Sequence, residues 1–365
     1  MIGVSGPVID IGVCAAAKVD DLDYAVLAEQ LGYSHFWVAD SQMIWSDCYA
    51  TLALVADRTS RIRIGTGVAV AGTRPAAVTA AAMATINRLA PGRVFCGIGT
   101  GNTAMRIMGH KPISLGEFDE HLRVLRSLLD GQETDVPWRG ATALTRHLMP
   151  DSGFVAFEPR IPLYVSAFGP KAMALAAKHG DGLVLSIPPV AAAMNRVWER
   201  LDAGAAAAGR TLDRANYLTC SLTTMVVLDE GESIDSSRVR NECGAFAVAS
   251  LHYAYEQWRQ YGRSPSGMLA EIWPDYVAML DEVPAERRHM RIHAGHNCWV
   301  EPDEERFITK ELMEATCLIG TPAQLAQRLR ELAGAGLSQV MVLPPLEAKE
   351  RVLREVAEKV FPLLR

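Results

Sequence analysis

Several residues that can hold or move a proton follow directly after a short apolar run of the sequence. Asp40 and Ser41 come after His35–Val38, and Trp45 and Tyr49 lie a few residues further on. A carboxylate at the end of a buried strand can orient a substrate or relay a proton, while the alternative role is an N-cap for the next turn. Trp45 and Tyr49 could pack on a flat ring. We therefore predict a site at Asp40, with Ser41, Trp45 and Tyr49 as substrate contacts.

A second candidate for acid–base chemistry is the string Arg291–Asn297, which holds His293 and His296 in a chain with few histidines. Imidazole groups titrate near neutral pH and can act as general acid or base. Two histidines without a carboxylate triad or a cysteine pair at ligand spacing are a weak metal signature, so no metal site is predicted. Contact with a cofactor or substrate and a purely structural role both remain open.

Glycines mark two further segments. Gly65 and Gly67 interrupt the apolar run Ile62–Val68, which indicates a bulge or close approach of a ligand, or else tight packing. The string Gly97–Asn102 resembles a dinucleotide loop, but Asn102 stands where the third glycine is required. We expect Thr100, Gly101 and Asn102 to present backbone and side-chain groups at the site.

The segment Ala167–Lys171 contains a glycine and a proline at an expected helix start. This arrangement turns free N–H groups of the first helical turn toward an anion, and Lys171 adds positive charge. Phosphate binding by Gly169 and Lys171 and a simple turn between strand and helix are equally compatible with this segment.

These candidates must be held by regular elements, and one pattern recurs along the chain. An Ala- and Leu-rich helix ends in glycine, where we expect the left-handed conformation, and a short apolar strand follows. The glycines at these helix ends are Gly32, Gly92, Gly180 and Gly336. Eight such strands alternating with helices predict a (β/α)8 barrel, whose active groups stand at the carboxyl ends of the strands. A doubly wound sheet with an extra domain is the alternative. The eight predicted strands are Ile9–Val13, His35–Val38, Ile62–Val68, Val94–Ile98, Leu163–Ser166, Gly182–Ser186, Leu218–Val227 and Gln339–Leu343.

Two intervals break this rhythm. Residues 229–316 carry helical patterns at Arg238–Tyr261 and Met268–Asp281, and we predict a helical insertion over the carboxyl end of the barrel. The turn-rich stretch Val136–Pro159 is predicted to contain a β-hairpin. No linker divides the chain, so residues 1–365 are expected to form one domain.

Composition limits the possible partners. The chain has 36 basic and 42 acidic residues, a net charge of −6, and no Lys/Arg stripe for nucleic acid. No apolar run is long enough for a membrane span, and Met1–Gly12 lacks a secretory signal. The seven cysteines are scattered without a CxxC pair, as in reduced cytoplasmic proteins. A cytoplasmic protein that acts on a small molecule is expected.

Taken in order, these segments resemble the bacterial luciferase-like flavin and F420 oxidoreductases, in particular the methylene-tetrahydromethanopterin reductase-like and F420-dependent dehydrogenase-like members. The resemblance spans nearly the whole chain outside residues 229–316. It rests on an ordered set of segments: Phe36–Ser41, Ile62–Val68, Arg74–Ala76, Gly92–Val94, Gly97–Gly101, Ala167–Pro170, Gly180–Gly182 and Leu318–Pro322.

The resemblance implies a barrel, often a homodimer, that binds FMN or coenzyme F420 at its mouth. A cis peptide in the third strand would back the ring, and the matching bond is Gly67–Val68. Asp40 would hydrogen-bond near the cofactor or substrate, the loop through Thr100 and Gly101 would line the site, and the backbone at Ala167 and Gly169 would contact the phosphate arm.

The sequence departs from these relatives at two positions. Several carry histidine where this chain has Ser41, and sugar-phosphate dehydrogenases carry glutamate where Asn102 aligns, which argues against a sugar phosphate substrate. We expect hydride transfer or monooxygenation of a small organic substrate, with Asp40, Asn102, His293 and His296 as catalytic candidates. A barrel that has lost its cofactor and serves as a binding subunit is the main alternative, and a metal-dependent hydrolase is a third.

Overall fold

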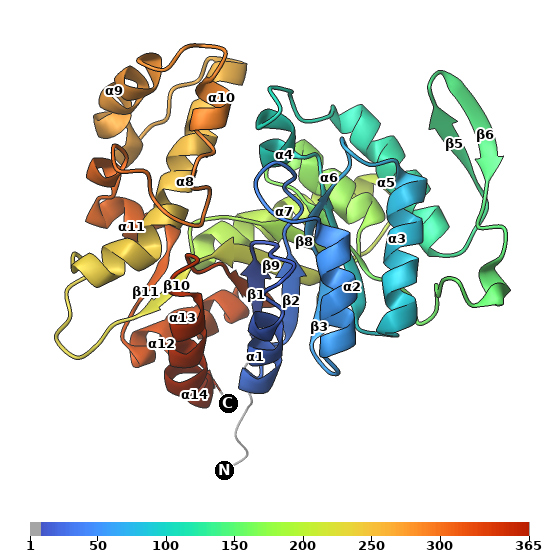
Figure 1. The fold of residues 1–365 in the computed structure, drawn as a ribbon, viewed down its shortest axis with the longest axis horizontal. Coiled ribbons are helices and arrows are strands. Elements are labelled where there is room, and N and C mark those ends of the chain that lie inside the picture. The colour runs from blue at the N-terminus through green and yellow to red at the C-terminus, as the bar shows by residue number, and fades with distance from the viewer. Residues whose placement is uncertain (1–8, 365) are drawn as a thin grey trace.

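Eight parallel strands close into a barrel at the centre of the computed structural model, which describes residues 9–364 (Figure 1). The strands follow each other around the barrel in chain order, so each βα unit lies beside the next. The predicted (β/α)8 architecture is therefore confirmed, and the doubly wound alternative is wrong. The barrel strands are β1 (Asp10–Ala15), β2 (His35–Val38), β3 (Arg63–Val70), β4 (Val94–Gly99), β7 (Leu163–Ser166), β8 (Gly182–Leu185), β9 (Leu218–Thr223) and β12 (Gln339–Val342).

Helices cover the outside of this barrel, and their apolar faces form the main core with the outward side chains of the strands. Pro322 opens α12 after the N-cap Thr321, whose side chain accepts the N–H of Gln324 in a capping box. The outer helices are α1 (Asp23–Leu31), α2 (Cys48–Arg58), α3 (Ala76–Leu89), α5 (Leu115–Leu129), α6 (Pro170–His179), α7 (Ala191–Ala207), α12 (Pro322–Gly334) and α13 (Lys349–Glu355), which a π-helical turn (Val356–Val360) joins to α14 (Phe361–Leu364).

The predicted strand Leu218–Val227 is wrong as a single element. The structure divides it into the barrel strand β9 and a short strand β10 (Met225–Val227), which leaves the barrel. Strand β10 pairs in parallel with β11 (Leu318–Gly320), with Met225 opposite Leu318. This pairing brings the two ends of the intervening segment together beside the barrel.

Glycine is required at the ends of the outer helices for two different reasons. Gly32 after α1 adopts a φ of 88°, and Gly336 after α12 adopts 91°, as predicted for left-handed caps. Gly180 after α6 is extended, with φ −86° and ψ 161°, so the prediction of a left-handed cap is wrong there. A Cβ at Gly180 would lie 2.8 Å from the carbonyl oxygen of Ala176, which means that space rather than backbone freedom requires glycine.

The interior of the barrel is filled by side chains, so the barrel is not a pore. The rings of Trp37 and Phe95 lie 4.3 Å apart, and Tyr164 packs against both. The indole N–H of Trp37 donates to Gln339 Oε1 over 2.9 Å, which satisfies the polar atom inside this apolar layer. A ligand therefore has access only above this layer.

The interval 229–316 folds as a helical insertion with an apolar core of its own, built around Val239, Leu251, Tyr276 and Leu280. It stands beside the barrel, with α8 and α10 near α4 (Figure 1). Its helices extend over the two predicted ranges almost residue for residue. They are α8 (Ser237–Tyr261), α9 (Met268–Asp281), α10 (Arg288–Arg291) and α11 (Lys310–Thr316), with a 3-10 turn at Glu305–Phe307.

The predicted hairpin lies between α5 and β7, where β5 (Thr134–Trp138) pairs antiparallel with β6 (Ala141–Thr145). The prediction placed it within Val136–Pro159, and only the first part of that stretch is paired. A 3-10 turn (Pro150–Ser152) and irregular chain complete the excursion.

Part of the N-terminal stretch Met1–Gly12, in which no secretory signal was found, lies outside the described residues. Within residues 9–364, no helix combines the length and the apolar character that crossing a membrane requires.

Candidate active site at the barrel mouth

The predicted site residues on the barrel follow four neighbouring strands, β2, β3, β4 and β7. Parallel strands end at the same rim, so Asp40, Gly67, Thr100 and Ala167 occupy one arc of the barrel mouth. The fold therefore brings together candidates that are more than 120 positions apart in the sequence.

Strand β3 is irregular at the predicted position. Its register against β4 shifts between Thr66 and Ala69, and the peptide bond Gly67–Val68 between them is cis, as the resemblance implied. Gly67 and Val68 are partly exposed, whereas Thr66 and Ala69 are buried. The bulge thus presents the backbone of Gly67 and the side chain of Val68 at the mouth.

The two glycines of β3 also meet strict packing demands. A Cβ at Gly65 would lie 2.2 Å from the carbonyl oxygen of Phe95, and one at Gly67 would lie 2.6 Å from Trp37 Cβ. Tight packing therefore accounts for Gly65 without a ligand. At Gly67, the Trp37 side chain leaves no room for a Cβ, and the backbone is also partly exposed at the mouth.

Asp40 stands at the rim immediately after β2 and is largely buried. Burial raises the pKa of this carboxyl group to about 6, although nearby Arg74 and the donating N–H of Val70 act in the opposite direction. A carboxyl group with this pKa exchanges its proton near neutral pH, which is the property that general acid–base catalysis requires.

The loop after β2 places its other candidates differently. The Ser41 side chain is buried, and the carbonyl of Ser41 accepts the N–H groups of Ile44 and Trp45 in a turn. The indole N–H of Trp45 points to Cys298 Sγ at 3.4 Å. The ring of Tyr49 is buried beneath the guanidinium of Arg74, 4.1 Å from its centroid.

The loop after β4 leads into a short helix, α4 (Asn102–Arg106), with Gly101 as a left-handed N-cap at φ 87°. Asn102 and Arg106 face the insertion from this helix. Asn102 Nδ2 lies 3.4 Å from Glu256 Oε2 on α8, and Arg106 Nε lies 3.3 Å from the same oxygen. Arg106 also donates to Gln260 Oε1. The insertion is therefore joined to the barrel mouth by buried polar contacts.

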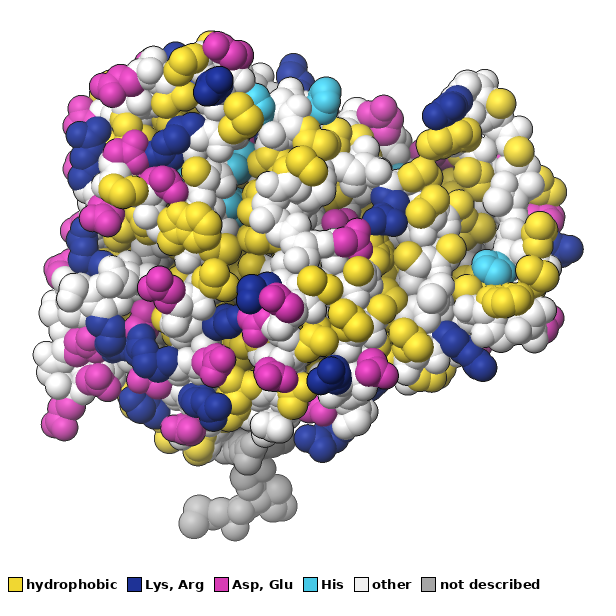
Figure 2. All heavy atoms as spheres, viewed as in Figure 1, with side chains coloured by type: hydrophobic (Ala, Val, Ile, Leu, Met, Phe, Trp, Pro, Cys, Tyr) yellow, Lys and Arg dark blue, Asp and Glu magenta, His cyan; other side chains and the backbone are white. Residues whose placement is uncertain are grey.

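The two predicted histidines lie in this same junction. His293 Nε2 is 2.8 Å from Glu256 Oε1, and the rings of His293 and His296 are 5.4 Å apart. The His296 ring is in turn 5.9 Å from Trp45. Histidine side chains show on the surface where the insertion meets the barrel (Figure 2). The fold thus brings the histidines to the predicted mouth.

Glu256 and Arg106 were missed by the sequence analysis. A weak signal for Glu256 did exist, because Tyr253, Glu256 and Gln260 recur at helical spacing on one face of α8. All three reach the barrel: Tyr253 lies 6.0 Å from Phe168, ring to ring, in the loop after β7. Arg106 carried no signal beyond its position four residues after Asn102.

The loop after β7 ends at α6, where Gly169 is the N-cap and Pro170 the first helical residue. Gly169 has no side chain to cap the helix, so the first-turn N–H groups are left for another acceptor. Space is open around Gly169, and Lys171 beside it is exposed. Ala167, in contrast, is buried and pairs through its N–H with Val184.

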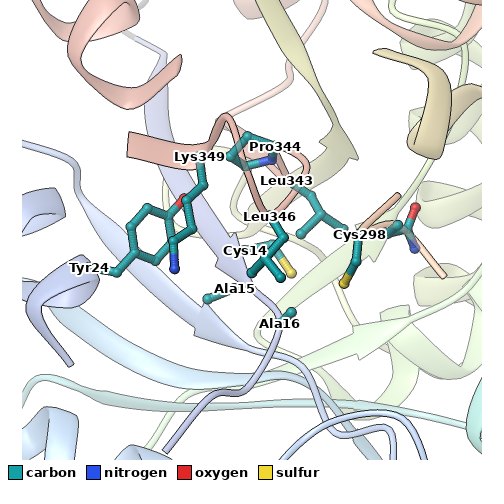
Figure 3. Close-up of a pocket in the computed structure, with 10 residues that line it drawn as sticks. Cys14, Ala15, Ala16, Tyr24, Cys298, Leu343, Pro344, Leu346 and Lys349 are labelled. Carbon is teal, nitrogen blue, oxygen red and sulfur yellow. The ribbon is translucent and has the colours of Figure 1, made fainter. Parts of the chain in front are cut away.

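A small pocket lies elsewhere on the rim, between the ends of β1 and β12 and the segment at Cys298 (Figure 3). Lys349 on its wall is already engaged, because it pairs with Asp21 and its Nζ lies 4.7 Å from the centroid of the Tyr24 ring. We assign no ligand to this pocket.

Across residues 9–364, no three histidine, cysteine, aspartate or glutamate side chains are grouped so that they could hold a metal ion. His293 pairs with Glu256, and His296 Nε2 lies 3.0 Å from the amide of Asn297. A metal-dependent hydrolase therefore finds no support in these residues.

Comparison with known proteins identifies the family of this chain. The family model for luciferase-like monooxygenases matches residues 16–339. The chain belongs to this family. Luciferase-like relatives include a 5,10-methylenetetrahydromethanopterin reductase of Archaeoglobus fulgidus, 27% identical over 95% of this chain and 97% of its own. An F420-dependent glucose-6-phosphate dehydrogenase of Kribbella flavida is 25% identical over 95% and 94%.

Solved structures agree on the fold of this luciferase-like chain. The F420-dependent tetrahydromethanopterin reductase of Methanopyrus kandleri has a TM-score of 0.70 at 19% identity, covering 99% of this chain and 100% of its own. An F420-dependent secondary alcohol dehydrogenase gives 0.68 at 18% identity and covers 98% and 99%.

Proposed function

We propose that this protein is an oxidoreductase that uses coenzyme F420 to transfer hydride to or from a small organic substrate. Flavin with oxygen, in a monooxygenase, is the second candidate. Support for F420 comes from the names of relatives that match over most of the chain, among them the Kribbella flavida dehydrogenase. Monooxygenase structures also share the fold, with TM-scores of 0.60 and 0.61.

The observation that carries the proposal is the bulge of β3, partly exposed at the mouth between Asp40 and the loop after β4. A flat ring requires an apolar wall with backbone groups within reach, and Gly67 and Val68 offer both. Thr100 and Gly101 lie beside them on the next strand end. The residues present therefore fit an isoalloxazine or deazaflavin ring.

The phosphate arm would lie at the start of α6. Its first-turn N–H groups and the exposed ammonium of Lys171 suit an anion, and the open space at Gly169 allows close approach. When bound, the cofactor supplies the hydride chemistry, and the protein contributes orientation, shielding and proton handling.

The substrate would lie between the ring and the insertion. Asp40 would orient it or exchange a proton, with Trp45 as an aromatic wall. Asn102, His293 and His296 would line the opposite side. The buried positions of Ser41 and Tyr49 leave them a supporting part in this proposal.

We further propose that the protein acts as a homodimer in the cytoplasm. Its seven cysteines are all free and buried, as in proteins of reducing compartments. Size-exclusion chromatography with light scattering would measure the subunit number directly.

Titration of the purified protein with F420 and, separately, with FMN tests the function, with cofactor fluorescence as the measurement. We expect F420 to bind more tightly. Lys171→Ala should weaken binding about tenfold, the loss of one charge-assisted hydrogen bond. The matched control is Lys310→Ala, which removes another exposed lysine from the first turn of a helix, in the insertion. Binding of neither cofactor would support the alternative of a non-catalytic barrel.

A further inference from the structure

Glu256 is a buried carboxylate that joins three parts of the chain. It lies on α8 and is only 6% exposed. Its oxygens contact His293 Nε2 at 2.8 Å, Arg106 Nε at 3.3 Å and Asn102 Nδ2 at 3.4 Å. Burying a charge is costly unless it is paired and hydrogen-bonded, and here the partners come from α4 and from the segment after α10.

These contacts continue across the mouth to the other side of β3. The series runs through Asn102, Glu256, His293, His296 and Trp45, and we call it the polar arc. Asn102 follows β4 and Trp45 follows β2, while β3 lies between these two strands in the barrel. The arc therefore spans the end of the strand whose bulge faces the mouth.

The hydrogen bonds of the arc fix where each imidazole carries its proton. A carboxylate only accepts, so His293 Nε2 donates to Glu256 Oε1, and in a neutral imidazole with this tautomer Nδ1 is the acceptor. The amide of Asn297 donates to His296 Nε2, which leaves the proton of that ring on Nδ1. Burial lowers the pKa of His296 well below its usual range, which keeps the ring neutral.

Both Nδ1 atoms are buried, and neither has a hydrogen-bond partner among residues 9–364. A buried polar atom without a partner costs free energy, and a bound ligand that completes the bonding would remove that cost. His293 offers an acceptor and His296 a donor, which together complement a group that both donates and accepts.

We propose that Glu256 is a positioning residue of the active site: it holds His293 in the Nε2–H form, so that Nδ1 can accept a proton from the substrate, and it fastens the insertion over β3. This inference rests on the proposed function and deepens it, because it selects His293 rather than His296 as the base. The charge of Glu256 is balanced by the guanidinium of Arg106, whose Nε lies 3.3 Å from Glu256 Oε2.

The insertion also contains a matched control. His252 Nε2 lies 2.8 Å from Glu304 Oε1, and Glu304 is 1% exposed. The other partners of this carboxylate are Tyr276 and Arg291, which both belong to the insertion. Glu304 therefore forms the same type of buried pair as Glu256, and the Nδ1 atom of His252 is likewise buried without a partner, but within residues 9–364 Glu304 has no hydrogen bond or ion pair to the barrel loops.

The test compares Glu256→Gln with Glu304→Gln by NMR of the imidazole nitrogens in protein labelled on its nine histidines. His293→Gln assigns the signal. In Glu256→Gln, Arg106 should hold the amide oxygen and turn the NH2 toward His293, which moves the ring proton to Nδ1. We expect the wild-type protein and Glu304→Gln to keep the Nε2–H form of His293. A wild-type Nδ1–H form, or a signal unchanged in Glu256→Gln, would overturn the inference.

Turnover gives the second readout, with the substrate found by screening the F420-loaded protein. Glu256→Gln should lower kcat about a hundredfold or more with KM within threefold, because one proton-transfer group is lost. Glu304→Gln should lower the thermal midpoint but leave kcat of the folded fraction unchanged. Equal losses in both variants would mean a structural role alone. Absence of binding by either cofactor would instead overturn the proposed function, together with the catalytic part of this inference.

Discussion

Asp40 should reduce the stability of the folded protein at neutral pH, and replacing it with asparagine should reveal by how much. Its pKa is about 6 in the folded protein against 3.8 for the free side chain. At about 1.36 kcal/mol per unit, this difference of about 2 units corresponds to about 3 kcal/mol. The asparagine oxygen can still accept the N–H of Val70, so the change removes mainly the buried charge.

The sign of the pH dependence follows from the raised pKa. The folded state binds the proton more tightly than the unfolded state, so the cost is absent below pH 3.8, grows up to about pH 6 and is complete above it. Asp40→Asn should therefore stabilise the protein by about 3 kcal/mol at pH 8 and by only about 1 kcal/mol at pH 4.5. For 365 residues, 3 kcal/mol corresponds to a rise in Tm of about 4 °C.

Thermal unfolding followed by circular dichroism at both pH values measures the effect. The control is Asp151→Asn, because Asp151 is exposed in the 3-10 turn Pro150–Ser152 and is not among the charges that act on the Asp40 carboxyl group. The control should shift Tm by less than about 1 °C. A lower Tm for Asp40→Asn at pH 8 would refute the reasoning, since Asp40 would then be a stabilising acceptor rather than a carboxylate held at a cost.

Three further outcomes follow from the same contacts. Arg74→Met should raise the pKa of Asp40 further, because Arg74 favours its charged form, and carboxyl NMR shifts would follow the titration. Gly65→Ala should cost about 3 kcal/mol in urea unfolding because its Cβ would overlap the Phe95 carbonyl, whereas Gly169→Ala, with open space around it, should leave stability within about 0.5 kcal/mol. The seven buried thiols should react with a thiol reagent only after unfolding, and fast labelling of the native protein would contradict their burial.

The barrel could be predicted because its signals are local. An apolar run reports a buried strand whatever surrounds it, so seven of the eight predicted runs lie on barrel strands and the eighth, Leu218–Val227, does so in its first part. The errors arose where the outcome depends on tertiary pairing. The run Leu218–Val227 contains no glycine or proline that would mark a break, and only the partner strand β11, about 90 residues later, decides that Met225–Val227 leaves the barrel. Gly180 looked like a cap because composition alone does not distinguish backbone freedom from lack of space.

The part of the site that lies at the carboxyl ends of the barrel strands could be predicted from the sequence. Asp40 and Gly67 follow from the rule that parallel strands present their carboxyl ends at one rim. Glu256 follows from no such rule, because a glutamate on a 25-residue helix is ordinarily a solvated residue. Its burial is decided by how the insertion lies on α4, and this depends on contacts between residues about 150 positions apart.

The insertion supplies a second titratable side chain beside the barrel mouth. The side chains of Ser41 and Asn102 do not ionise near neutral pH. Among the predicted site residues in the loops after β2 and β4, Asp40 therefore supplies the titratable group. Transfer of hydride to or from an oxygen-bearing carbon requires a proton to move as well, and an acid–base pair needs groups that differ in their protonation. His293 lies 2.8 Å from one oxygen of Glu256, and Asn102 at the rim lies 3.4 Å from the other oxygen. In the proposed mechanism, the ring and Asp40 thus belong to the barrel and the second proton carrier belongs to the insertion, so the contacts that join α8 to α4 also complete the acid–base pair.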